Sequence, residues 1–100
     1  MKVLISKGYG AGWSTWNCKE MAIDKDLIAL FESGGSLEEM QELCRVKGYD
    51  DGYGGAPYFG GFDGLAVVEV PEGTHFIIRE YDGAEFIEIF TKTDWLYANE

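Results

Sequence analysis

The amino-acid sequence predicts one α+β domain over residues 1–100, with the element order β-α-α-β-β-β. The expected architecture is a mostly antiparallel sheet with a helical hairpin packed on one face. Three observations support this fold class: an apolar run at residues 2–6, two amphipathic segments with capping signals between residues 24 and 48, and three strand-like runs joined by turn sequences after residue 64.

Capping signals define the two helices. Asp24 is a good N-cap for the first helix, and Gly34 is placed to end it in the left-handed conformation. Ser36 and Glu39 have the spacing of a capping box, which predicts a second helix that ends at Gly48. Because the link between the helices is so short, they are expected to form an antiparallel hairpin.

The last third of the chain is predicted to be a β-meander, with which the first strand is expected to pair. Residues 65–70 form an apolar strand, and Pro71-Glu72-Gly73 fits a type I turn. Asp82-Gly83 is the preferred sequence of a two-residue hairpin turn between strands at 75–81 and 84–91. The register that this turn imposes gives the hairpin an apolar core face, made of Phe76, Ile78, Ile87 and Ile89.

The same register places Glu80 opposite Glu85, beside the turn. Paired carboxylates can perform acid–base chemistry or hold a hard cation. A hairpin tip is normally exposed, however, so we expect a solvated acidic tip rather than a site. On the other face of the hairpin, Arg79 should lie within diagonal reach of Glu88.

The charge of the chain restricts its partners. Eighteen acidic and eight basic residues give a net charge of −10, and the basic residues are scattered along the sequence. Such a charge repels phosphate backbones and anionic lipids, so direct binding of nucleic acid or membranes is not expected. It suits a protein partner with a basic surface, although the same charge also simply keeps a small protein soluble.

Little in the sequence suggests catalysis or metal binding. Cys18 and Cys44 lack CxxC spacing, and His75 is the only histidine. We therefore predict no catalytic residues, no metal site and no cofactor, and we do not expect an enzyme.

The chain shows neither a secretory signal nor a membrane-spanning apolar run, which predicts a cytoplasmic protein.

Two segments rich in glycine and aromatic residues, 7–17 and 49–64, are the most unusual parts of the chain. Both are predicted to be loops, because glycine disfavours helix interiors, and a long irregular segment in a small domain is often functional. Their rings could contact a protein or stack on a flat ligand such as a base, and the alternative is a well-packed structural loop. The predicted ligand- or partner-binding residues are Tyr9, Gly10, Gly12, Trp13, Trp16, Tyr53, Tyr58 and Phe59.

Three segments, Gly8–Trp16, Val68–Thr74 and Glu80–Glu85, resemble loop and turn motifs of small uncharacterised proteins of phages and prophages. This resemblance implies a phage or mobile-element origin, and it brings no assigned chemistry and no catalytic residues. Small acidic phage proteins are often inhibitors of host machinery or defence, including anti-CRISPR proteins. The sequence thus predicts a non-enzymatic binding protein that acts on a protein partner in the host cytoplasm. The alternative is a small-ligand or nucleotide-binding protein that uses the two loops.

Overall fold

The computed structural model describes residues 1–50 and 55–90, so Tyr53 and the end of the last predicted strand lie outside the described residues. The predicted α+β class and the β-α-α-β-β-β order are confirmed, and two short 3₁₀ helices that the sequence did not indicate are added. The elements are β1 (Lys2–Ser6), η1 (Lys19–Ile23), α1 (Lys25–Glu32), α2 (Leu37–Val46), η2 (Phe62–Gly64), β2 (Leu65–Glu69), β3 (His75–Tyr81) and β4 (Ala84–Phe90).

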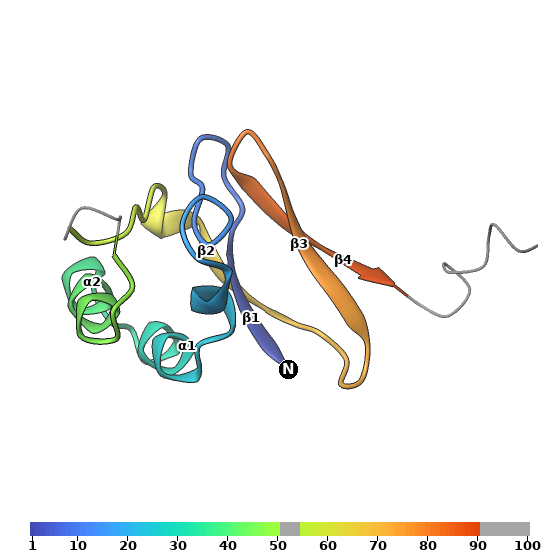
Figure 1. Cartoon of the computed structure of the whole chain (residues 1–100), viewed down its shortest axis with the longest axis horizontal. Helices are drawn as coiled ribbons and strands as arrows, with labels where there is room; N and C mark the ends of the chain where they lie inside the picture. The colour runs from blue at the N-terminus through green and yellow to red at the C-terminus, as the bar shows by residue number, and fades with distance from the viewer. Residues whose placement is uncertain (51–54, 91–100) are drawn as a thin grey trace, which may run out of the picture.

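The four strands form two separate antiparallel pairs rather than one sheet. β1 pairs with β2, so the first strand does pair with the C-terminal strands, whereas β3 pairs with β4. The helices lie on one side of the β1–β2 pair and the β3–β4 hairpin lies on the other (Figure 1). The domain therefore has three layers, with β1–β2 in the middle.

β1 is buried on both faces because a hydrophobic core lies on each side of it. Leu4 points into the larger core, together with Trp13 and residues of both helices. Val3 and Ile5 point into a smaller core that includes Ile78 of β3. Since successive side chains of a strand point to opposite faces, five residues suffice to join the two cores.

The predicted helix boundaries are confirmed. The Asp24 carboxylate accepts hydrogen bonds from two backbone N–H groups in the first turn of α1. Ser36 and Glu39 form the expected capping box at the start of α2. Gly34 and Gly48 follow the two helices with φ angles of +89° and +85°, the left-handed conformation that glycine adopts without strain.

Asp24 also connects the two helices. Tyr49 Oη donates a hydrogen bond to Asp24 Oδ2 at 2.9 Å, and Lys47 Nζ lies 3.1 Å from the same oxygen. Partial burial acts to raise the pKa of Asp24. Three interactions outweigh this effect and lower the pKa below its usual value of 3.8: the hydrogen bond from the Leu27 N–H, the ion pair with Lys47, and the hydrogen bond from Tyr49.

The hairpin turn between β3 and β4 is also as predicted. Asp82 and Gly83 have φ angles of +50° and +86°, which identifies a type I′ turn. The resulting register places Glu80 opposite Glu85, and Arg79 forms the expected ion pair with Glu88.

Two details of the meander were predicted wrongly. The turn after β2 runs from Pro71 to Thr74, one residue later than expected, with Gly73 at its third position and a φ of +79°. A positive φ there is typical of a type II turn, not of type I. Ile89, predicted to lie on the core face, is exposed; it lies near the end of β4, and Figure 1 shows this end of the strand apart from β1.

Gly83→Ala should destabilise the domain more than Gly73→Ala does. Both residues have a left-handed φ, which costs alanine about 1–2 kcal/mol. A Cβ at Gly83 would also lie 2.7 Å from Ala11 N, whereas a Cβ at Gly73 would meet nothing within 4 Å. Urea unfolding followed by tryptophan fluorescence should give a loss of at least about 3 kcal/mol for Gly83→Ala. Equal losses for the two variants would contradict this contact.

Asp24→Asn should flatten the dependence of stability on acid pH. Because the folded-state pKa of Asp24 is lowered from 3.8, its stabilising contribution is present above that pH and is lost as the pH falls through the folded-state value. Asparagine preserves the N-cap. Unfolding free energies measured between about pH 5 and about pH 2 should therefore fall less steeply than in the wild type. The exposed Asp63→Asn is the control, and a slope equal to that of the wild type would refute the assignment.

Candidate functional site

The two glycine- and aromatic-rich loops meet in space. Asn17 Nδ2 donates hydrogen bonds to Trp13 O at 2.7 Å and to Tyr58 O at 2.9 Å. The N–H of Tyr58 donates back to Asn17 Oδ1 at 3.3 Å, and Tyr58 Oη donates to Gly10 O at 3.2 Å. The sequence does not mark Asn17 as a site residue, because its role depends on a loop some 40 residues away.

The tip of the β3–β4 hairpin lies against the first loop, and Figure 1 shows the two side by side. The N–H of Gly10 donates a hydrogen bond to Asp82 O. Gly83 faces the loop backbone so closely that a side chain would overlap Ala11 N. Three segments distant in the sequence, the first loop, the second loop and the hairpin tip, thus converge on one region.

Glu85 is the residue that fixes this convergence, and the expectation of a solvated acidic tip is wrong for it. Its side chain is only 3% exposed. Glu85 Oε1 accepts a hydrogen bond from Ser6 N at 2.9 Å. Glu85 Oε2 accepts from Thr15 N at 2.9 Å, Thr15 Oγ1 at 2.6 Å and Trp13 N at 3.2 Å. A carboxylate has about four acceptor positions, so Glu85 is fully occupied as a structural group and is not free for acid–base or metal chemistry.

Glu80, on the neighbouring strand, is exposed as expected. Glu80 Oε2 accepts hydrogen bonds from Gly83 N at 2.8 Å and from Trp16 Nε1 at 3.4 Å. Within the described residues no hydrogen bond reaches Glu80 Oε1. The carboxylate is therefore held in place while one oxygen still faces solvent.

The predicted contact residues divide into covered and exposed groups. Trp13 and Phe59 belong to the larger core and pack on each other with ring centroids 4.4 Å apart, so neither ring can meet a partner in this conformation. Gly12 is buried beneath Trp16, whose ring would lie 1.9 Å from a Cβ at that position. Gly10 lies exposed on the loop, with a φ of +70°.

Four rings remain exposed around the convergence of the loops and the hairpin. Tyr9 and Tyr81 are 74% and 72% exposed and meet edge to face, with centroids 6.2 Å apart. Trp16 and Tyr58 are 45% and 49% exposed and stack, with centroids 5.9 Å apart and planes 13° from parallel. We call Tyr9, Trp16, Tyr58 and Tyr81 the aromatic rim. Tyr81 was missed because its position before the turn indicated only a strand end.

The charge at this region is negative. Residues 8–17, 55–62 and 80–85 contain no lysine or arginine, and their acidic residues are Glu80, Asp82 and the buried Glu85. The exposed rings therefore lie beside two carboxylates, Glu80 and Asp82, which are both exposed.

The cysteines and the histidine are not arranged for nucleophilic chemistry. Cys44 is buried in the helical core, where burial raises the pKa of its thiol to about 12. Burial also raises the pKa of Cys18. Thiols with raised pKa values are weak nucleophiles at neutral pH. His75 is exposed at the start of β3, whereas Cys18 lies just before η1 and Cys44 lies on α2.

Residues 1–50 and 55–90 contain neither a candidate metal cluster nor a candidate membrane-spanning helix. No three histidine, cysteine or acidic side chains gather there in a way that could hold a metal ion. Neither α1, α2 nor any other helix in this part of the chain has the length and apolar character required to cross a bilayer.

Glu85→Ala should destabilise the domain by at least about 3 kcal/mol, because it leaves the N–H groups of Ser6, Trp13 and Thr15 without an acceptor. Glu85→Gln should cost less, since its amide keeps one acceptor oxygen. Glu80→Ala, at the opposing position on the hairpin, should cost less than about 1 kcal/mol. Urea unfolding of the three variants tests this order, and similar losses for Glu80→Ala and Glu85→Ala would contradict it.

Comparisons with known proteins gave no match. No protein family matches its sequence, and no significant similarity was found to a curated protein or to a solved structure. Its function has to be inferred from its own residues.

Proposed function

We propose that this chain is a non-enzymatic binding protein that contacts a basic protein partner through the aromatic rim and the carboxylates of Glu80 and Asp82. The observation that carries the proposal is the gathering of four exposed aromatic rings from distant segments beside those acids. Tyrosine and tryptophan are enriched at protein interfaces and among the few residues that carry most of the binding energy there.

Two of the four rings, Trp16 and Tyr58, are held in place in the free protein. Tyr58 is held by its stacking on Trp16 and by hydrogen bonds to Asn17 and Gly10. Trp16 is held by Tyr58 and by Glu80. Because little side-chain freedom remains to be lost on binding, more of the contact energy appears as affinity.

The charge favours a partner that presents arginine or lysine. A cationic side chain can lie on an exposed ring of the rim and pair with Glu80 Oε1 or with Asp82. The net charge of −10 also accelerates the approach of a basic protein.

The resemblance to phage proteins supports a role as an inhibitor of host machinery or defence. Two of the three resembling motifs, Gly8–Trp16 and Glu80–Glu85, supply the first loop and the hairpin tip of this region. A basic host protein in the cytoplasm, for example one whose own groove binds nucleic acid, is the partner class that this proposal favours.

The nucleotide-binding alternative has less support. Two of its expected stacking rings, Trp13 and Phe59, are covered, and Trp16 and Tyr58 stack on each other. A nucleotide phosphate also requires basic or amide groups, whereas the exposed charges at the rim are carboxylates.

The double variant Trp16→Ala/Tyr81→Ala should no longer bind the basic protein partner. The test is capture from host lysate at about 50 mM and about 500 mM salt, followed by titration calorimetry with the purified protein that is captured. Wild type should bind it more weakly at high salt, and each truncated ring should cost about 2 kcal/mol of binding free energy.

Phe86→Ala is the matched control, since Phe86 is an exposed ring on β4 outside the aromatic rim, and it should bind as wild type does. Equal binding by the double variant would refute the proposal. A rise in melting temperature with a panel of nucleotides, lost in the double variant, would favour the alternative instead.

A further inference from the structure

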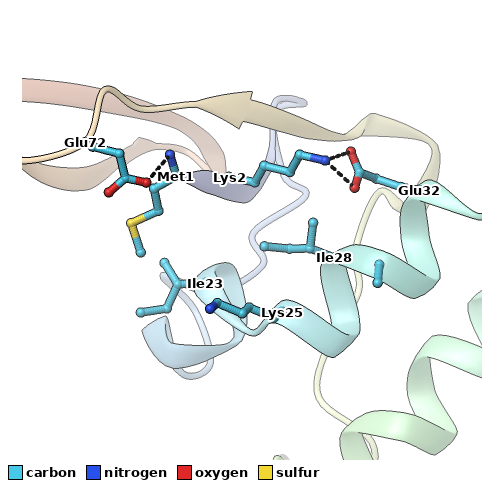
Figure 2. A pocket seen from close by; sticks show the side chains of 8 residues that line it. Met1, Lys2, Ile23, Lys25, Ile28, Glu32 and Glu72 are labelled. Atoms are coloured by element: carbon cyan, nitrogen blue, oxygen red, sulfur yellow. Dashed lines mark hydrogen bonds and ion pairs between the residues drawn. The ribbon is translucent and has the colours of Figure 1, made fainter.

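A second feature, independent of the proposed function, is a surface hollow between the start of β1, η1 and α1 (Figure 2). Its volume is about 360 Å³, which lies within the range of about 300–1,000 Å³ that is usual for small-molecule sites. None of its lining residues belongs to the aromatic rim.

The floor of the hollow is apolar. Ile28 and Ala29 contribute from α1, and Ile23 contributes from the end of η1. The Met1 side chain faces Ile23 across the opening (Figure 2). Ile23 and Met1 are both large apolar side chains that remain exposed, so an apolar ligand here would remove their surface from water.

One cation that lines the hollow has no ion pair within the described residues. Glu32 pairs with Lys2 at 2.8 Å, and Glu72 pairs with the Met1 amino group at 3.1 Å. Both lining carboxylates thus have a cationic partner, and the Met1 amino group also lies 3.5 Å from Glu69 Oε2, outside the hollow. Lys25, by contrast, makes no ion pair or hydrogen bond through its side chain within the described residues, and its ammonium group lies beside Ile23 at the edge of the hollow (Figure 2).

We infer that this hollow binds a small carboxylic acid with an apolar body, with the carboxylate on Lys25 and the body on Ile23, Ile28 and Ala29. One free cation matches one negative charge. A multiply charged phosphate would find only Lys25 unpaired, because Lys2 and the Met1 amino group already pair with Glu32 and Glu72. A neutral apolar molecule would contact Ile23, Ile28 and Ala29 but would leave Lys25 without a partner, so it should bind more weakly than the carboxylic acid.

The test is titration of the ¹⁵N-labelled full chain with sodium octanoate, with 1-octanol as the neutral probe of equal length. Octanoate should shift the amide signals of residues 23–29. It should bind about twofold to fivefold more tightly than 1-octanol. Lys25→Gln should remove this difference, whereas Lys19→Gln, an exposed lysine that does not line the hollow, should preserve it.

Ala29→Phe provides a second variant, because Ala29 is exposed on α1 and a phenyl ring there would occupy the hollow without disturbing the core. It should abolish the octanoate shifts while the melting temperature stays near that of the wild type. Three results would overturn the inference: equal binding of octanol and octanoate, unchanged octanoate binding in Lys25→Gln, or shifts confined to residues outside 23–29.

Discussion

The buried carboxylate of Glu85 is the interaction on which the arrangement of the domain depends. The two strand pairs share no ladder of backbone hydrogen bonds, yet Glu85 on β4 accepts from Ser6 at the end of β1 and from Trp13 and Thr15 in the first loop. A buried charge is tolerated only when its hydrogen bonds are complete. Glu85 therefore fixes where the hairpin lies against the first loop, and with it the positions of Tyr9 and Tyr81.

Features that depend on neighbouring residues were readable from the sequence. The capping box of Ser36 and Glu39 and the Asp82-Gly83 turn involve residues at most three positions apart, so local backbone preferences determine them. The turn even predicted that Glu85 shares a face with Ile78. What the sequence did not indicate was that a loop 70 positions earlier covers that face.

The division into two strand pairs and the exposure of the rings could not be predicted from the sequence, because both depend on contacts between distant segments. Met1 and Val70, 69 positions apart, exchange hydrogen bonds that continue the β1–β2 pairing up to the turn before β3. Trp13 and Trp16 are three residues apart in one loop, and no local pattern separates the core ring from the exposed one. Only the contacts of that loop with Tyr58, Phe59 and Glu80 distinguish them.

The position of β1 between two cores has a consequence for how the chain folds during synthesis. Its partner strand lies more than 55 residues downstream, so the apolar Val3-Leu4-Ile5 run leaves the ribosome long before β2 exists. The helical hairpin consists of local contacts and can form in that interval, whereas the middle layer has to wait. Until β2 arrives, an unpaired apolar strand is available for aggregation or for a chaperone. The pairing of β1 with β2 is thus the long-range step in forming the domain.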